Sequence, residues 1–92
     1  MPVIWDPIEA AASEAAHGVK FADAATVLND ERALTREDPD SIGEQRFVTL
    51  GQSAEGKLLV VIYTYRDSDV LRIIWAWKAN RRQRARYEEG RS

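Results

Sequence analysis

Two apolar segments near the C-terminal end constrain the fold of this 92-residue chain more than any other feature. The first, LLVVIYTYR at 58–66, is crowded with β-branched and aromatic residues, which favours a strand over a piece of buried helix. It is also too short to span a membrane as a helix. The second, VLRIIWAWK at 70–78, follows a short polar turn. We therefore expect the two segments to pair as an antiparallel hairpin.

The second segment alternates, and successive side chains of a strand face opposite sides of the sheet. The alternation predicts one apolar face formed by Leu71, Ile73, Trp75 and Trp77, and an opposite face formed by Arg72, Ile74, Ala76 and Lys78. On this pattern the two tryptophans belong to the core. The alternative, in which they stack against nucleic-acid bases, stays open.

Local signals predict two helices before the hairpin and one after it. Asp6 is a good N-cap for a helix that begins at Pro7 and ends before Gly18. Its apolar stripe is thin and consists of Ile8, Ala11, Ala12, Ala15 and Ala16. A second helix is expected from Phe21 to Leu28, and Asn80 with Gln83 forms a capping box for the last one.

Two further strands are predicted, an edge strand at 32–35 and a strand at 46–51 that leads into the hairpin. Segregated helices and strands of this kind favour the α+β class. We expect one domain over residues 1–92, with two N-terminal helices, a three- to four-stranded antiparallel sheet covered by helices on one face, and a C-terminal helix.

Composition excludes several classes of function. The chain has no cysteine, so neither a disulfide framework nor a thiolate nucleophile is available. It has one histidine, which excludes a ribonuclease mechanism that uses two histidines. No glycine-rich phosphate loop and no metal-ligand spacing occurs, so we expect no cofactor and no metal site. No signal peptide or membrane segment is apparent, which predicts a cytoplasmic protein.

Positive charge gathers at the C-terminal end. Residues 78–92 contain six basic and two acidic side chains, although the whole chain has a net charge of −2. Arg81 and Arg82 lie in the first turn of the last helix, where the helix dipole disfavours cations. This arrangement favours an anion site for phosphate, together with Arg84 and Arg86. The alternative is a solvated charged helix.

A second cluster of charge is predicted on the sheet. Glu44 and Arg46 lie at the start of one strand, and Arg66 and Arg72 lie on paired strands. A carboxylate beside several cations can accept the proton of an RNA 2′-hydroxyl and stabilise the charge that develops on the phosphate. An exposed network of ion pairs is the alternative. His17 is a candidate general base or a residue of the helix end.

These residues and motifs resemble the BrnT toxins of bacterial type II toxin-antitoxin pairs. The resemblance rests on WDP near the start, AAHGVKF, the EQR at 44–46, LLVVIYTYR, and an RII…A…KANRR segment that leads to YEE. It implies a RelE-like fold and a metal-independent endoribonuclease that inhibits translation. The implied partner is a BrnA-like antitoxin with a ribbon-helix-helix domain, and contact with DNA is expected only through that antitoxin. The resemblance is also compatible with a homodimer.

The resemblance also implies roles for individual residues. The family's polar positions correspond to His17, Glu44, Arg46, Arg66, Arg72 and Lys78. We expect catalysis by Glu44, Arg66, Arg72 and Lys78, and RNA binding by Arg46, Arg81, Arg82, Arg84 and Arg86. The chain departs from the usual residues at Ala15, Ala16, Asp40, Trp75 and Trp77. These departures keep a second hypothesis open, an attenuated or non-catalytic protein that only binds antitoxin or RNA.

Overall fold

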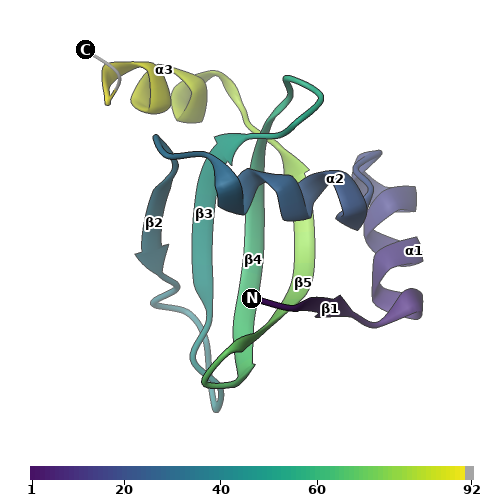
Figure 1. The fold of residues 1–92 in the computed structure, drawn as a ribbon. Helices are drawn as coiled ribbons and strands as arrows, with labels where there is room; N and C mark the ends of the chain where they lie inside the picture. The colour runs from purple at the N-terminus through teal and green to yellow at the C-terminus, as the bar shows by residue number, and fades with distance from the viewer. Residues whose placement is uncertain (91–92) are drawn as a thin grey trace.

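The two apolar segments pair as the centre of a five-stranded sheet (Figure 1). The computed structural model describes residues 1–90, and the sheet has the strand order β1-β5-β4-β3-β2. The strands are β1 (Val3–Trp5), β2 (Leu34–Glu37), β3 (Phe47–Gln52), β4 (Leu58–Asp67) and β5 (Val70–Lys78). The helices are α1 (Pro7–His17), α2 (Phe21–Thr26) with a 3-10 turn η1 (Val27–Asn29), and α3 (Arg81–Glu89).

The α+β class is confirmed, but the predicted three- to four-stranded antiparallel sheet is wrong. β1 was not predicted, and it pairs in parallel with β5, so that the sheet is mixed. Three residues are too few to show a period, and no pairing partner lies near β1 in the sequence. The helix layout is not the RelE-like one that the resemblance implied.

The N-terminal helix begins and ends as predicted, but it packs through the opposite side. Asp6 Oδ1 accepts a hydrogen bond from the Ile8 N–H at 2.8 Å, and Gly18 adopts a left-handed φ of 71°. Ile8 is 80% exposed, and the alanines at 11, 12, 15 and 16 are exposed as well. The predicted apolar stripe therefore faces away from the sheet.

A polar stripe at four-residue spacing holds α1 to β5 instead. Glu9 pairs with Arg72, and the ring of His17 packs against Trp75. Between them the buried Ser13 hydroxyl donates to the Ala76 carbonyl and accepts from the Ala76 N–H, at 3.1 and 3.2 Å. The β5 edge beyond its pairing with β1 is thus covered, which satisfies backbone groups that an open edge would expose.

A β-bulge in β5 overturns the predicted division of its faces. Ile73 pairs with Tyr63 and Trp75 pairs with Ile62, so Ile74 is an extra residue on β5. An extra residue reverses the alternation that follows it. The tryptophans at 75 and 77 therefore share a face with Arg72, opposite Leu71 and Ile73.

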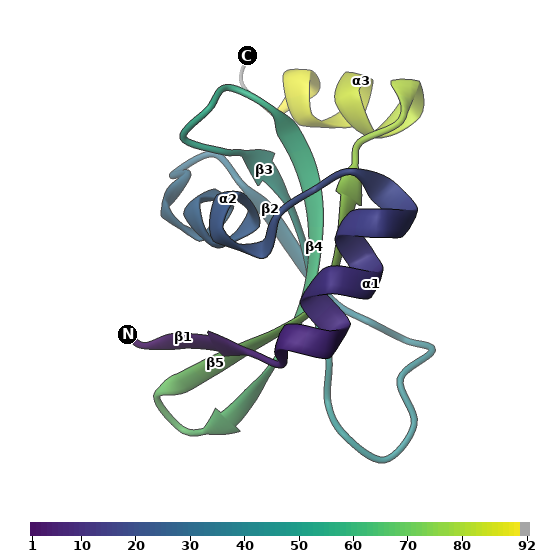
Figure 2. The ribbon, with the colours of Figure 1, turned by 90° about the vertical axis from the view of Figure 1, so that its right-hand side faces the viewer.

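The two faces of the sheet carry different clusters of buried side chains. α2 covers one face, where Phe21 and Val27 pack with Leu59, Val61 and the neighbouring apolar residues of β4 and β5. α3 covers the upper end of the other face through a smaller cluster that includes Leu58, Val60 and Tyr87. Figure 2 shows α2 and α3 on opposite sides of the sheet.

α3 is fixed by its capping box, as predicted, and by one buried side chain. Asn80 and Gln83 form the reciprocal capping box at 2.8 Å. Tyr87 is 4% exposed, and its hydroxyl donates to Asp30 Oδ2 at 2.6 Å. The same carboxylate accepts the N–H of Gln52 at the end of β3. Asp30 therefore ties α3 and β3 to the segment after η1.

Gly51 allows η1 to approach β3. A Cβ atom at residue 51 would lie 2.9 Å from Val27 Cγ1 and 3.0 Å from Ala33 Cβ. These distances are shorter than the usual separation between carbon atoms that are not bonded. A side chain at this position would therefore push the Asp30 segment away from the sheet. The pair of Gly51 and Asp30 thus sets how α3 docks.

Asp30→Asn should destabilise the protein at neutral pH, by about 1 kcal/mol. Burial on its own raises the pKa of Asp30, but hydrogen bonds from Gln52, Tyr87 and Arg32, with the Arg32 charge, outweigh burial and lower the pKa. A lowered pKa in the folded state means that the stabilisation is present above the unfolded-state pKa. It is lost as the pH falls from about 4 through the folded-state pKa.

The measurement is urea unfolding of wild type and Asp30→Asn between pH 7 and pH 3. The difference in unfolding free energy should shrink as the pH falls. Asp40→Asn, a change in an exposed loop, is the matched control and should shift stability little at any pH. A difference between wild type and Asp30→Asn that stays constant down to pH 3 would contradict the assignment.

Candidate functional site

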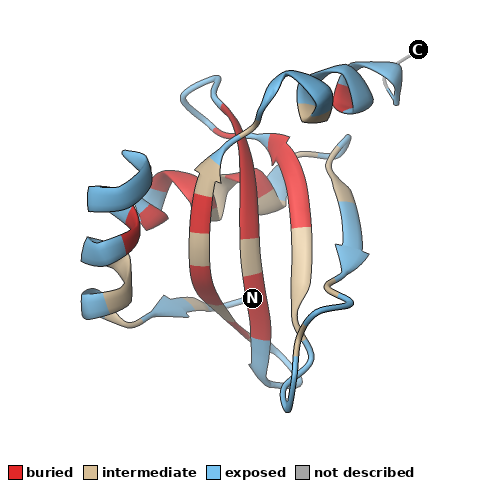
Figure 3. Cartoon of the chain, turned by 180° about the vertical axis from the view of Figure 1, so that it is seen from behind, coloured by how far each residue is buried: buried red, intermediate tan, exposed pale blue. Residues whose placement is uncertain are grey.

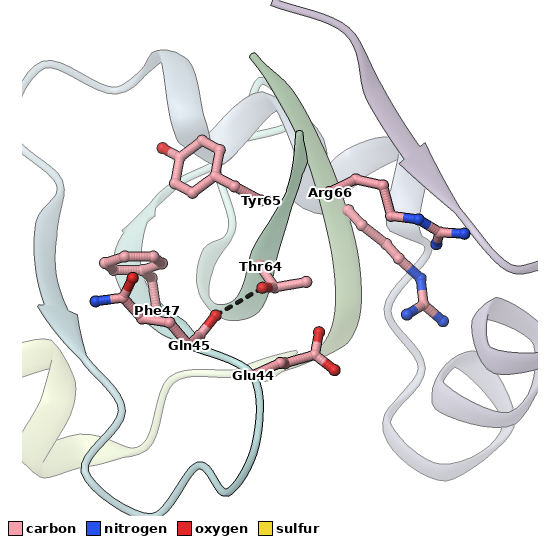
Figure 4. Close-up of a pocket in the computed structure, with 7 residues that line it drawn as sticks. Glu44, Gln45, Phe47, Thr64, Tyr65 and Arg66 are labelled. Carbon is pink, nitrogen blue, oxygen red and sulfur yellow. Dashed lines mark hydrogen bonds between the residues drawn. The ribbon is translucent and has the colours of Figure 1, made fainter. Parts of the chain in front are cut away.

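A hollow of about 420 Å³ opens at the end of the sheet where the β4–β5 turn lies. It is lined by the segment before β3, by β4 and by β5, through Glu44, Gln45, Phe47, Thr64, Tyr65, Arg66 and Arg72. Three of the four predicted catalytic residues are therefore brought together. Figure 4 shows Glu44 and Arg66 on one side of β4, with Phe47 and Tyr65 on the other.

Glu44 is placed by its neighbour in the chain. The Thr64 hydroxyl in β4 donates to the Gln45 carbonyl at 2.6 Å, which attaches the loop before β3 to the sheet (Figure 4). The Glu44 carboxylate is exposed and lies 3.9 Å from Arg46. A carboxylate held on a fixed backbone but open to solvent is free to accept a proton from a bound substrate.

The two arginines of the hollow differ in how they are held. Arg72 pairs with Glu9 at 2.6 Å, and the side chains of Arg72 and Glu9 are 23% and 34% exposed. Arg66 is an exposed residue at an irregularity of β4, because Tyr65 pairs with Leu71 and Asp67 with Val70. None of the ion pairs within residues 1–90 involves Arg66. Its guanidinium is available for an anion.

The arrangement of one carboxylate and two guanidiniums fits a phosphodiester. Guanidinium groups bind phosphate oxygens in a bidentate manner and keep their charge at any physiological pH. The hollow therefore places a base in the same site as two permanently charged side chains. A simple network of surface ion pairs would not require a hollow of this kind. No group of three or more histidine or acidic residues within residues 1–90 is arranged to hold a metal ion.

Two predicted site residues lie outside the hollow. Lys78 is six residues beyond Arg72 on β5, which is about 20 Å along a strand. His17 is two turns beyond Glu9 on α1, about 12 Å along the helix axis. The His17 ring lies edge-to-face against Trp75, with ring centroids 5.4 Å apart, and 6.1 Å from Trp77. His17 thus contacts the aromatic residues of β5 and not the cluster at Glu44.

The predicted RNA-binding residues also divide between two places. Arg46 lies beside Glu44. Arg81, Arg82 and Arg84 are exposed on α3, at the other end of the sheet. Arg86, also on α3, lines a shallow apolar groove with Arg36 of β2. Arg91, which contributed to the positive charge of the C-terminal end, lies outside the described residues.

Two residues that position the site were not predicted from the sequence. Glu9 holds Arg72, and Thr64 holds the backbone next to Glu44. Each contact joins residues 63 or 19 positions apart, so no local pattern shows it. An acidic residue at the third position of a helix is also typical of a capping box, so Glu9 alone does not indicate a contact with β5.

No helix among the described residues is long and apolar enough to cross a membrane.

One protein-family model matches most of the chain. Residues 5–83 match the family described as "Ribonuclease toxin, BrnT, of type II toxin-antitoxin system". The fold is similar to the crystal structure, at 1.1 Å resolution, of the Brucella abortus ribonuclease toxin BrnT, with a TM-score of 0.65 and 24% sequence identity. The similar region covers 88% of this chain and 99% of that one. No curated protein sequence matches the chain.

The different environments of the two arginines predict different costs of removal. Arg72→Ala should lower the free energy of unfolding by about 1 kcal/mol, because it breaks the half-buried pair with Glu9. Arg66→Ala should change it by less than about 0.5 kcal/mol. Urea unfolding measures both, and Glu9→Gln provides the reciprocal test, since its effect should not add to that of Arg72→Ala. Equal losses for Arg66→Ala and Arg72→Ala would contradict this difference.

Proposed function

The chain belongs to the BrnT family of ribonuclease toxins of type II toxin-antitoxin systems, and from this membership we propose that it cleaves RNA and so inhibits translation. The hollow that contains Glu44, Arg66 and Arg72 carries the proposal. RNA carries the nucleophile for its own cleavage in the 2′-hydroxyl, so the protein needs only a proton acceptor and positive charge at the phosphate.

In the proposed reaction the 2′-oxygen attacks the adjacent phosphorus while Glu44 accepts the 2′-hydroxyl proton. The phosphorus then carries additional negative charge on its equatorial oxygens, which Arg66 and Arg72 stabilise. The bond from phosphorus to the 5′-oxygen breaks, and that oxygen takes a proton from solvent. The products are a 2′,3′-cyclic phosphate and a free 5′-hydroxyl.

The remaining predicted cations extend the RNA path beyond the hollow. Lys78 ends β5 on the face opposite Arg72, because the bulge reverses the alternation, and Arg81, Arg82, Arg84 and Arg86 follow on α3. Together with Arg46 they would contact the sugar-phosphate backbone, which contributes affinity without sequence preference. Binding of this kind weakens as the salt concentration rises.

A type II toxin acts with an antitoxin, and we propose a BrnA-like ribbon-helix-helix protein as the partner. Contact with DNA would then come only through the antitoxin. The proposed reaction needs no metal ion, because Glu44 and the two arginines supply the base and the positive charge. A homodimer is compatible with this proposal.

Arg66→Ala should abolish growth arrest and RNA cleavage while the protein stays folded. The side chain is exposed and contributes little to stability, but a guanidinium aimed at a developing phosphate charge typically contributes about 10² to 10³ in rate. Glu44→Gln should have a similar effect, because it removes the proton acceptor and keeps the size of the side chain. Growth after induced expression and cleavage of total RNA are the readouts.

Arg32→Ala is the matched control, an exposed arginine before β2, away from the hollow. It should leave growth arrest intact. If Arg66→Ala and Glu44→Gln are folded and as active as wild type, the hollow is not the active site. If wild type itself fails to cleave RNA but still binds antitoxin, the protein is the non-catalytic variant of the family.

Cleavage should continue in excess chelator. The base and the cations of the proposed mechanism are side chains. Removal of divalent ions should therefore change the cleavage rate by less than about two-fold, apart from any effect of those ions on the folding of the RNA. Purified protein assayed on total RNA with EDTA, and then with added magnesium, gives the measurement. Activity that disappears with EDTA and returns with magnesium would overturn metal independence.

A further inference from the structure

We propose that Trp75 is a stacking platform for an unpaired RNA base, one position along the sheet from Arg72 of the hollow. This inference rests on the proposed function, since it names a contact for the RNA of that same site. The alternation of β5 placed Trp75 in the core with Leu71 and left base stacking as the alternative. The bulge at Ile74 reverses that placement.

The register of the hairpin fixes the spacing. Arg72 pairs with Thr64, and Trp75 pairs with Ile62, two residues along β4. The arginine and the tryptophan therefore occupy successive positions on one face, about 7 Å apart. A base next to a phosphate held by Arg72 would reach the indole ring without any change in the sheet.

This face of the sheet is open where Trp75 lies. Figure 3 looks directly onto this face, which points away from the viewer in Figure 1, and α3 covers only its upper end. Ile62 and Val48, which pair with each other on β4 and β3, are half-buried like Trp75. Unpaired bases can bury their apolar rings against a sheet surface of this kind and so remove them from water.

The indole ring is held in place before any ligand binds. His17 lies edge-to-face against it at an interplanar angle of 87°. Trp77, the next residue on this face, packs with Leu58, Val60 and the rest of the smaller cluster under α3. Trp77 therefore supports the surface as part of the core, and Trp75 is the ring that remains for stacking.

Charge around the open face favours a polyanion. Arg36 pairs with Val48 at one side, and Arg72 and Arg66 lie at the end toward the hollow. Single-stranded nucleic acids are bound by this combination, cations that follow the backbone and aromatic rings that stack with bases. Aliphatic and aromatic surface without such cations would fit a protein segment instead.

The chain contains three tryptophans, so Trp75 can be made the only one. In the Trp5→Phe/Trp77→Phe protein, a 2′-O-methyl RNA strand, which lacks the free nucleophile and cannot be cleaved, should quench the fluorescence of Trp75. An abasic strand of the same length keeps its phosphates and should quench little. Equal quenching by both strands, or none by either, would overturn the proposal.

Affinity gives the second measurement. Trp75→Ala should raise the Kd for the 2′-O-methyl strand about 5- to 150-fold, the range found when a stacking ring is removed. Trp75→Phe keeps a ring and should recover most of the affinity. Trp5→Phe, a change on α2's side of the sheet where Trp5 contacts Phe21, should have no effect. An unchanged Kd for folded Trp75→Ala would overturn the proposal.

The results also separate this inference from the proposed function. Trp75-dependent binding without cleavage by wild type would support the platform and contradict the ribonuclease. Cleavage by wild type with a Kd that is indifferent to Trp75 would support the ribonuclease and overturn the platform. If Trp75→Ala reduces only the capture of co-expressed antitoxin, the face belongs to the protein partner and the platform is wrong.

Discussion

The extra residue at Ile74 determines what each face of the sheet can do. Before it, Leu71 and Ile73 point into the main core under α2, and after it Trp75 and Trp77 point to the other face. Without the bulge both tryptophans would lie in a core that Val61 and Ala76 already fill, and native cores do not accept such an increase in volume. The bulge therefore permits a packed core on one face and, on the other, a row of large polar and aromatic side chains that begins at Arg72.

α1 completes this arrangement, since it reaches β5 through side chains that the sequence shows as polar. Glu9 contacts Arg72, Ser13 contacts Ala76, and His17 contacts Trp75 and Trp77. Buried polar groups are tolerated because each has a partner, and within residues 1–90 no buried side-chain nitrogen or oxygen lacks one. The helix thus orients an arginine of the hollow and the indole beside it with the same face that covers the strand edge.

How much of this was visible in the sequence depends on the distance over which each signal acts. The caps at Asp6 and Asn80, the glycine at 18 and the strands of the hairpin were predicted, because they depend on neighbours within a few residues. β1, the bulge and the face on which α1 packs were not predicted, because their partners are distant in the sequence. The partners of β1 and α1 lie 68 and 63 residues away, and those at the bulge lie 10 to 13 residues away, where no local period reveals them. The grouping of the predicted site residues was visible only in part. The hollow gathers Glu44, Arg66 and Arg72, whereas the nine-residue length of β5 keeps Lys78 apart.

The open face has a cost for stability that the rest of the fold has to offset. Val48, at the margin of the smaller cluster, and Ile62, outside both clusters, remain half-buried. α3 is held at the upper end of the sheet by Tyr87 and Asp30 and does not cover them fully. Covering these residues would remove more apolar area from water and stabilise the chain by about 25 cal/mol per Å². A sequence selected for stability alone would extend that helix or place a polar side chain at Ile62. The chain instead keeps an uncovered apolar surface between arginines. A binding surface requires this, since stability is commonly lower where a ligand must bind.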